Sequence, residues 1–402
     1  MPEVFVGRQP IYDKKLEVFA YELLFRSGED NWTRVEDDDK ATSQIILNTF
    51  LEIGLDRIAG PHRVFINVGR SFLLGEFPIP LPQDRIGLEI LEDVTVDERL
   101  VEGVRALAAK GHLIALDDFV LNDDTRPLLD LADIIKIDIS TMNRATLAQH
   151  VATLRPWKSK LLAEKVETQE EFEFCRQLGF DYFQGYFFCR PSIVKGQRIP
   201  ANRLAILRLL AKLQDPSTTV KELEEIISHD VSLSYKLLRY INSAAFALTR
   251  RIDSIKQAVI YLGTQTIKHW VILFALSGIN DKPHELMVTA LVRARMGELL
   301  ARALAARDPD VFFTVGLFST LDALMDMPMA RVVESLPLSE AVSLALLEQA
   351  GPYGQVLRCI LAYERGDWDR VEAALPLANE SIRDAYLQAI AWADDVGASL
   401  RT

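Results

Sequence analysis

HLIALDD, residues His112–Asp118, is the most informative stretch of this sequence: the apolar run Leu113–Leu116 ends at two adjacent carboxylates. A short unbroken apolar run predicts a strand buried on both faces, as in a parallel sheet covered by helices. Asp117 and Asp118 then lie at the carboxyl end of that strand, which is where barrels and doubly wound α/β folds carry their chemistry. The stretch therefore predicts an α/β fold with an acidic site at one edge.

The same arrangement recurs in three further segments. GLEILE carries Glu89 and Glu92, DIIKID carries Lys136, and KLLAEKVE carries Glu164 and Glu167. Because the carboxyl ends of neighbouring parallel strands meet at one edge, these side chains are expected to converge. Several acids and a lysine gathered in this way predict a metal-dependent active site.

The rest of the first half alternates between strand and helix patterns. The first two predicted strands, Val4–Tyr12 and Val18–Phe25, are joined by a connection so short that it favours an antiparallel pair. The later strands are separated by segments with helical spacing, which indicates βαβ units and a parallel sheet. These strands are expected at Arg63–Val68, Ile86–Glu92, Asp133–Asp138, Leu161–Val166 and Phe183–Phe188.

Helix boundaries are predicted from capping signals. Thr95 with Glu98, and Thr168 with Glu171, have the spacing of capping boxes. A further amphipathic helix is expected over residues 41–53. The pattern fits a modified (β/α)8 TIM-like barrel with one antiparallel strand. A doubly wound open sheet is the alternative, but no glycine-rich phosphate turn follows the first strand.

Beyond about Pro200 the pattern is helical throughout, with helices expected near residues 201–213, 219–227, 232–242, 254–262 and 266–276. The polar stretch Ser192–Asn202 contains Gly196 and Pro200 and reads as a link. We therefore predict a barrel domain over residues 1–192, a linker over 193–202 and an all-helical domain over 203–402.

Composition narrows the class of protein. The chain has 402 residues, a net charge of -12 and 49% hydrophobic residues, which is typical of globular proteins and argues against a nucleic-acid partner. Its three cysteines are too scattered for a disulfide framework or a zinc site. No signal peptide and no membrane-length apolar run is visible, so a cytoplasmic protein without a membrane partner is expected.

These motifs together resemble the EAL domain, the bacterial barrel that hydrolyses cyclic di-GMP. The naming motif is matched by Glu22-Leu23-Leu24, with Arg26 two residues on. The other matches follow in the family's order, each at a strand end: Asn67 in FINV, Glu89 and Glu92 in LEILE, Asp117 and Asp118 in ALDDF, Lys136 in IIKID, Glu164 and Glu167 in AEKVE, and Gln184 in FQGYFF.

The resemblance implies a role for each matched residue. One of two Mg²⁺ or Mn²⁺ ions would be held by Glu22, Asn67, Glu89 and Asp117, and the second would be shared by Asp117 and Asp118. Lys136 and Glu164 would orient and deprotonate the attacking water. Glu167 and Gln184 would support the metal site, Glu92 would anchor a loop, and Arg26 would meet a substrate phosphate. A homodimer formed near the central strand is also implied.

Three departures from the family pattern lie close to this site. The family's Phe-Gly-x-Gly loop is replaced by Phe119-Val120-Leu121-Asn122, followed by Asp123 and Asp124. Lys165 replaces a glycine, and Leu23 replaces an alanine. Branched Val120 does not readily adopt the positive φ that glycine adopts. The substrate-facing loop is therefore expected to follow a different path.

The helical half resembles the HDOD domain, a relative of HD phosphohydrolases, through residues 230–246 and 251–263. At the position of the metal-binding His-Asp pair the chain has Ser319-Thr320, and His229-Asp230 is expected to be a helix cap. The resemblance implies a non-catalytic module that binds a protein partner. Two readings follow for the whole chain: a cyclic di-GMP phosphodiesterase, or an inactive regulator that binds cyclic di-GMP or a protein.

Overall fold

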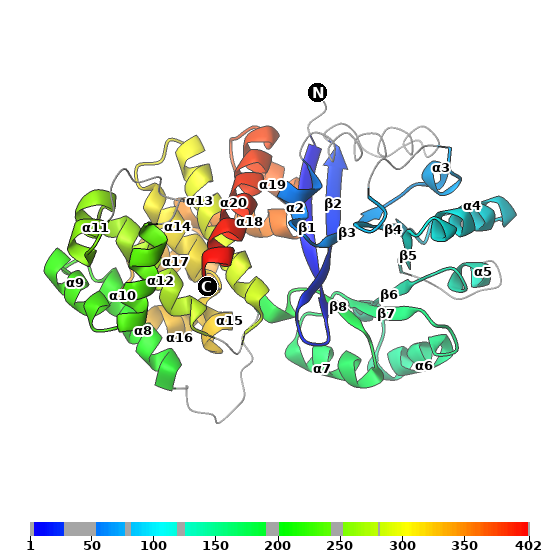
Figure 1. Cartoon of the computed structure of the whole chain (residues 1–402), viewed down its shortest axis with the longest axis horizontal. Coiled ribbons are helices and arrows are strands. Elements are labelled where there is room, and N and C mark those ends of the chain that lie inside the picture. Colours follow the sequence, from blue (N-terminus) through cyan, green and yellow to red (C-terminus); the bar gives the residue numbers. More distant parts are fainter. Residues whose placement is uncertain are drawn as a thin grey trace. The chain divides into compact units, whose positions relative to one another are not determined.

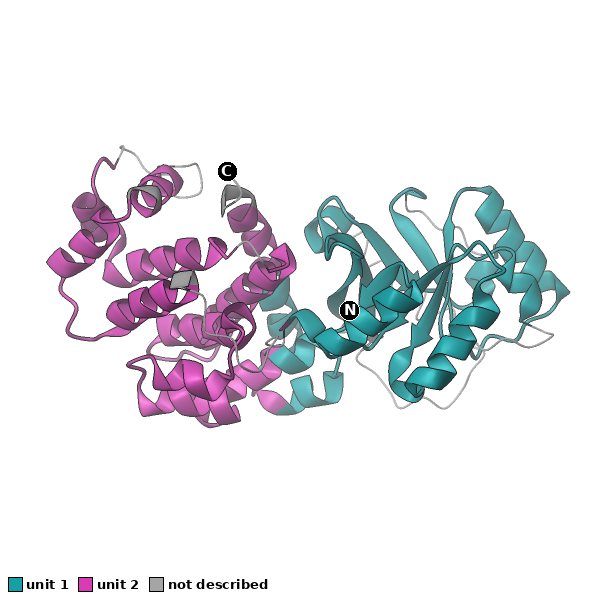
Figure 2. Cartoon of the chain, turned by 90° about the horizontal axis from the view of Figure 1, so that it is seen from below, with its two compact units in different colours: residues 1–188, 361–373, 377–387 teal, residues 189–360, 374–376, 388–402 magenta. Residues whose placement is uncertain are grey.

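The computed structural model describes residues 4–27, 54–76, 82–118, 125–189, 201–242, 252–279 and 282–400. The chain divides into two compact units, drawn in teal and magenta in Figure 2. Unit 1 consists of residues 1–188, 361–373 and 377–387, and unit 2 of residues 189–360, 374–376 and 388–402. The predicted helix over 41–53 and most of the predicted linker lie outside the described residues.

Unit 1 contains a closed barrel of eight strands that follow one another in sequence order (Figure 1). β1 pairs antiparallel with both β2 and β8, and every other neighbouring pair is parallel. The modified barrel with one antiparallel strand is therefore confirmed, and the open sheet is excluded. The strands are β1 (Val4–Asp13), β2 (Val18–Ser27), β3 (Arg63–Asn67), β4 (Ile86–Ile90), β5 (Leu113–Leu116), β6 (Ile134–Asp138), β7 (Lys160–Glu164) and β8 (Tyr182–Gln184).

Helices and short turns connect these strands. In the first half of the chain they are α2 (Leu55–Ala59), α3 (Arg70–Leu73), α4 (Glu98–Ala109), α5 (Arg126–Leu129), η1 (Ile139–Thr141), α6 (Arg144–Leu154), α7 (Gln169–Leu178) and η2 (Phe187–Cys189). The capping box of Thr168 and Glu171 is present at the start of α7, and Gly179 ends that helix at φ 91°. The predicted box of Thr95 and Glu98 is wrong. Asp97 caps α4 instead, because its carboxylate accepts the backbone N–H of Leu100 at 2.8 Å.

The inside of the barrel is filled by one layer of mostly apolar side chains. Its buried members are Ile11, Ala20, Phe65, Ala115, Ile134 and Leu162, and Phe19, Leu113 and Tyr182 pack against them. Gly87 of β4 completes the layer, since a Cβ atom there would lie 2.3 Å from the ring of Phe65. Such a filled interior is a packed core rather than a pore. It separates the two ends of the barrel and supports whatever lies above it.

Unit 1 also includes two segments from the C-terminal end of the chain. Tyr363 donates a hydrogen bond to the carbonyl of Val6 at 3.1 Å, and Tyr386 accepts one from the backbone N–H of Arg8 at 3.2 Å. A Cβ atom at Gly7 would lie 3.2 Å from the Trp368 ring. Residues 361–373 and 377–387 thus pack on β1. The compact unit that contains the barrel therefore includes these two segments, which lie beyond the barrel domain predicted over residues 1–192.

Unit 2 is helical. The helices of the second half of the chain are α8 (Ala201–Gln214), α9 (Val220–Ser228), α10 (Val231–Ile241), α11 (Ile255–Leu262), α12 (Thr264–Ser277), α13 (His284–Ala303), α14 (Pro309–Phe318), α15 (Leu321–Met325), α16 (Met329–Glu334), α17 (Glu340–Glu348), α18 (Gly351–Glu364), α19 (Trp368–Ala374) and α20 (Asn379–Leu400). All of α19 except Ala374 belongs to unit 1, and α18 and α20 are each divided between the two units. The prediction of an all-helical second half is confirmed for the described residues.

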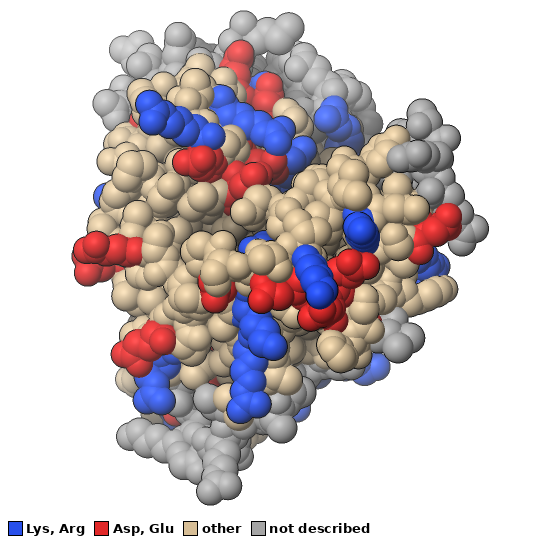
Figure 3. Space-filling view, turned by 90° about the vertical axis from the view of Figure 1, so that its left-hand side faces the viewer, with Lys and Arg blue, Asp and Glu red and all other residues tan. Residues whose placement is uncertain are grey.

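Charged side chains of both signs are mixed on one face of the protein. On the face shown in Figure 3, lysine and arginine side chains are interspersed with aspartate and glutamate among a larger area of other residues. Among the described helices, none combines the length and the apolar character that a membrane crossing requires.

Candidate metal-dependent active site

Each strand of the barrel contributes one residue to a polar layer directly above the apolar one. Successive inward-facing side chains are two residues apart along a strand, so the position two residues beyond each core residue faces the same interior. On β2, β5, β6 and β7 this step leads from Ala20, Ala115, Ile134 and Leu162 to acids and one lysine. Taken around the barrel, the layer consists of Gln9, Glu22, Asn67, Glu89, Asp117, Lys136, Glu164 and Gln184.

Lys136 lies at the centre of this layer. Its Nζ atom is 2.9 Å from Asp117 Oδ1, 3.0 Å from Glu164 Oε1, 3.1 Å from Glu89 Oε1 and 3.4 Å from Glu22 Oε2. The lysine side chain is almost completely buried. One ammonium group therefore carries the only positive charge that contacts these four carboxylates among the described residues. The structure thus brings together five residues that were singled out in the sequence.

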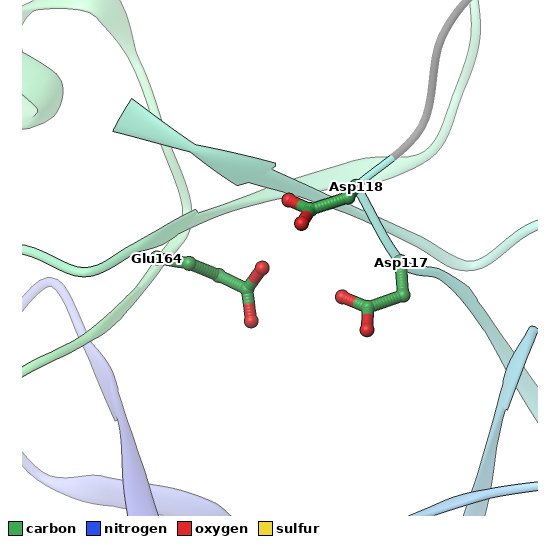
Figure 4. Close-up of side chains that lie close together, drawn as sticks. All are labelled: Asp117, Asp118 and Glu164. Atoms are coloured by element: carbon green, nitrogen blue, oxygen red, sulfur yellow. The ribbon is translucent and has the colours of Figure 1, made fainter. Parts of the chain in front are cut away.

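Asp118 joins the cluster from the other side. Carboxylate oxygens of Asp117, Asp118 and Glu164 all lie within 4.8 Å of one another, and the three side chains point toward one another in Figure 4. Asp118 adopts φ 42°, in the left-handed region, which turns the chain immediately after β5. Asp118 thereby comes close to Asp117 instead of being directed to the opposite side, as strict alternation would place it.

Burial and mutual repulsion strongly perturb the acids of this cluster. Burial, and next the charge of Glu22, raise the pKa of Glu89 well above its usual value, although Lys136 opposes the shift. Burial raises the pKa of Glu164 to about 8, again against Lys136. Burial and the charge of Asp117 raise the pKa of Asp118. Acids perturbed in this way, held in a cluster without enough positive charge, are typical of functional sites.

Lys136 titrates in the opposite sense. Burial by itself would lower its pKa, but the charges of Glu22, Glu89, Glu164 and Asp117 together raise the pKa well above its usual value. The ammonium group thus stays protonated throughout the neutral range. In this form it can position a water molecule or a substrate oxygen by donating hydrogen bonds, but it cannot accept a proton.

Gln184, on the antiparallel side of the barrel, contacts both Glu22 and Gln9. Gln184 Nε2 donates to Glu22 Oε2 at 2.6 Å and to Gln9 Oε1 at 3.0 Å. The metal-supporting role of Gln184 stays a prediction. Gln9 was missed in the sequence. The available signal was its position two residues before Ile11, in a strand that runs in the opposite direction, so that the site lies on the N-terminal side of the core residue.

The layer contains buried oxygen atoms that accept no hydrogen bond from the described residues and would suit a hard cation. Within the described part of the chain, Asn67 Oδ1 is buried without a hydrogen-bond donor, and neither carboxylate oxygen of Glu89 accepts a hydrogen bond, despite the ion pair with Lys136. Buried polar atoms rarely remain unpaired unless a ligand satisfies them. Carboxylate and amide oxygens are the donors that Mg²⁺, Mn²⁺ and Ca²⁺ prefer, so this residue set fits divalent ions.

Three predicted site residues, Glu92, Glu167 and Arg26, are not among the residues of the polar layer. Glu92 is exposed in the turn after β4. Glu167 is exposed too, and its backbone N–H donates to Glu171 at 2.8 Å. Arg26 is part of β2, but its side chain lies outside the described residues, as does the altered loop over 119–124. The roles suggested for these three residues stay predictions.

The helical unit has no His-Asp pair at the position where an HD enzyme binds metal. Ser319 follows α14 there, and its Oγ donates to the carbonyl of Gly316 at 2.7 Å and lies 3.2 Å from Arg293 Nη1. Thr320 Oγ1 donates to the carbonyl of Leu317 at 3.0 Å. Both hydroxyls thus stabilise the end of the helix. As predicted, Asp230 caps a helix, since it accepts the backbone N–H of Leu233 at 3.0 Å.

Comparisons with known proteins find two domain families in this chain. The family model of the EAL domain matches residues 70–191, and that of the HDOD domain matches residues 199–335. The chain is 35% identical over 402 residues to the uncharacterized protein YuxH of Bacillus subtilis, with 97% of this chain and 98% of YuxH covered. It is 35% identical over 404 residues to the cyclic di-GMP phosphodiesterase CdgJ of Vibrio cholerae, with 98% of this chain and 94% of CdgJ covered.

A solved structure with a related sequence is the calcium and cyclic di-GMP complex of BlrP1 from Klebsiella pneumoniae. It is 25% identical to this chain, with a TM-score of 0.39, and the match covers 47% of this chain and 56% of BlrP1. The two near-complete matches, with both domain models in the same order, establish the family. The chain belongs to the EAL–HDOD proteins that include YuxH and CdgJ.

Proposed function

We propose that the barrel is a phosphodiesterase that opens cyclic di-GMP to linear pGpG with the help of two divalent ions, Mg²⁺ or Mn²⁺. The observation that carries the proposal is the acidic cluster at the polar layer, where carboxylate oxygens of Asp117, Asp118 and Glu164 lie within 4.8 Å of one another. The same layer contains Asn67 Oδ1, which is buried without a hydrogen-bond donor. Cyclic di-GMP is proposed as the substrate because the chain matches, over nearly its full length, a relative described as a cyclic di-GMP phosphodiesterase.

The chain's own residues divide the work by their positions. Glu22, Asn67, Glu89 and Asp117 would hold one ion, and Asp117 with Asp118 would share the second. Bound divalent ions neutralise the phosphoryl oxygens and lower the pKa of water. Glu164, whose pKa burial raises to about 8, is suited to accept a proton from the attacking water near neutral pH. Lys136 contacts the same carboxylate at 3.0 Å and would orient that water.

Purified protein incubated with cyclic di-GMP and Mn²⁺ or Mg²⁺ tests the proposal, with linear product followed by chromatography. Asp117→Asn and Glu164→Gln are each expected to lower the rate at least about 100-fold, because each removes a metal oxygen or the base. Glu170→Gln is the matched control, since Glu170 is an exposed acid on α7. Wild-type protein that yields no product with either metal would refute the catalytic proposal.

The second candidate function is that of an inactive regulator. The observation that favours it is Lys136, whose ammonium group contacts four carboxylates and offsets part of their charge without an ion. Calorimetry distinguishes the two: binding of cyclic di-GMP without product identifies a sensor. In cells, Glu164→Ala abolishes the biological effect of an enzyme, whereas a regulator that acts by binding retains it.

We propose further that the helical unit is a non-catalytic output module that binds a protein partner. Its described surface exposes large apolar side chains on α10 and α11, with Tyr235 63% and Ile260 72% accessible. Homodimer formation, which the resemblance to EAL proteins implies, stays a prediction that light scattering of the purified protein can test.

A further inference from the structure

Lys165 holds an unusual backbone conformation beside the acidic cluster. It follows Glu164 directly and adopts φ 55°, in the left-handed region. For a residue with a Cβ atom this conformation costs about 1 kcal/mol, and glycine avoids the cost. A lysine that keeps a conformation suited to glycine indicates that its side chain contributes something in return.

The ammonium group of Lys165 is anchored at its tip. Nζ lies 2.5 Å from Oδ2 of Asp138, at the end of the neighbouring strand β6. Asp138 is almost fully buried, and its other oxygen accepts hydrogen bonds from the backbone N–H of Ser140 at 2.8 Å and from its hydroxyl at 2.6 Å. Since Asp138 is fixed in this way, it determines where the ammonium group lies.

The side chain of Lys165 nevertheless remains open to solvent, with 61% of it accessible. The positive charge interacts with Asp118 and Glu164 as well as with Asp138. Lys165 therefore lies at the accessible rim of the acidic cluster, while Lys136 lies at its buried centre. A ligand that approaches the cluster from solvent can reach the outer lysine.

Charge balance shows what a cation at this rim would do. The described site holds six carboxylates, on Glu22, Glu89, Asp117, Asp118, Asp138 and Glu164, and two ammonium groups, on Lys136 and Lys165. Two divalent ions would bring this set to neutrality. Glycine at position 165 would leave it negative, which would repel the two phosphates of a cyclic dinucleotide.

We propose that Lys165 is a substrate-contacting residue that donates to a non-bridging oxygen of a phosphodiester while Asp138 holds it in position. This inference rests on the proposed phosphodiesterase function. Phosphate contacts by a partly desolvated ammonium group act on substrate binding more than on the chemical step, unless the contact strengthens in the transition state. The main effect of losing the contact is therefore expected in KM and in the dissociation constant.

The test compares three substitutions at Lys165, which directly follows β7, with a control at the start of that strand. Lys165→Gln is expected to raise KM for cyclic di-GMP about tenfold, with kcat changed less than about threefold. Lys165→Arg retains the charge and is expected to stay within about threefold of wild type in KM. Lys165→Gly removes the charge but relieves the backbone, so it should melt at or above the wild-type temperature and still show the raised KM.

Lys160→Gln is the matched control. Lys160 is exposed to a similar extent, 58%, and pairs with Asp181 at 3.5 Å, but it lies at the opposite end of β7. Its loss should leave KM unchanged. Calorimetry with cyclic di-GMP in Ca²⁺ provides a second readout, in which Lys165→Gln should weaken binding about tenfold.

Two results would overturn the inference, and they can be told apart. If wild type binds and hydrolyses the dinucleotide, but Lys165→Gln matches it in KM and in binding, Lys165 has only a structural role and the phosphodiesterase proposal stands. If wild type neither binds nor hydrolyses the dinucleotide, the proposed function fails and this inference fails with it.

Discussion

Glu89 shows how a single residue at this site can favour function over stability. Its side chain is fully buried, and both burial and the charge of Glu22 raise its pKa well above the usual value. An acid whose folded-state pKa is raised destabilises the fold at any pH where it must ionise, so its cost is largest at neutral and alkaline pH. A bound cation would remove that cost.

Substituting Glu89→Gln should therefore change thermal stability in opposite ways with and without metal. In EDTA the variant is expected to melt a few degrees above wild type, because a buried, repelled acid has been neutralised. In Mn²⁺ wild type should gain several degrees and the variant much less, because binding to the native state alone stabilises it. Differential scanning calorimetry measures both. Equal metal-induced shifts in the two proteins would show that Glu89 is not a ligand.

Among the strands, β1 contacts both the C-terminal segments of the chain and the polar layer of the barrel. On one edge of β1, the carbonyl of Val6 accepts a hydrogen bond from Tyr363, and the backbone N–H of Arg8 donates one to Tyr386. The next residue, Gln9, accepts from Gln184, which also holds Glu22. Val6 and Arg8 thus contact the C-terminal helices, and Gln9 of the same strand belongs to the polar layer.

Tyr386→Phe tests the packing on β1. Loss of the hydroxyl removes the acceptor for the Arg8 N–H and should lower the free energy of unfolding by about 1 kcal/mol. Amide hydrogen exchange in β1 should become faster, whereas β6 is expected to be affected less. The control is Tyr235→Phe, because Tyr235 is exposed on α10 and its hydroxyl can be solvated. Unchanged exchange in β1 would mean that this contact does not stabilise the strand.

Helix starts show how far local sequence can be trusted at this scale. The capping box of α7 was predictable because Thr168 and Glu171 satisfy each other locally. At α4, Thr95 and Asp97 are both candidate caps. Asp97 is the cap, because its carboxylate also pairs at 2.6 Å with Arg70, which lies on another helix. A contact between residues far apart in the sequence selected between two local signals of similar strength.

At the scale of the whole molecule, the barrel unit is completed by the other end of the chain. Residues 361–373 and 377–387 belong to the same compact unit as the strands. They place Trp368 within 3.2 Å of where a Cβ atom of Gly7 would lie, and Tyr186 donates a hydrogen bond to the carbonyl of Glu364. A barrel expressed without these segments would expose that surface of β1.

Residues 1–192 produced alone are therefore expected to melt well below the barrel of the full chain or to aggregate, since the uncovered β1 loses apolar contacts and hydrogen bonds. Adding a peptide of residues 361–387 should raise the melting temperature, and a peptide with Tyr363, Trp368 and Tyr386 replaced by alanine should not. An isolated barrel as stable as the full protein would show that the C-terminal segments are dispensable.

Local signals in the sequence predict the barrel and single out most residues of its polar layer. Alternation within each strand and acids at successive strand ends are such signals, and in a barrel the period of two alone brings seven of the eight positions of the layer, all but Gln9, to the same level, from Glu22 through Gln184. Tertiary structure alone decided the role of Gln9, the placement of Lys136 among four carboxylates and the packing of residues 361–387 on β1. The packing on β1, for example, depends on the contact between Arg8 and Tyr386, which are 378 positions apart. A local pattern of residues cannot predict which distant residue will lie next to it.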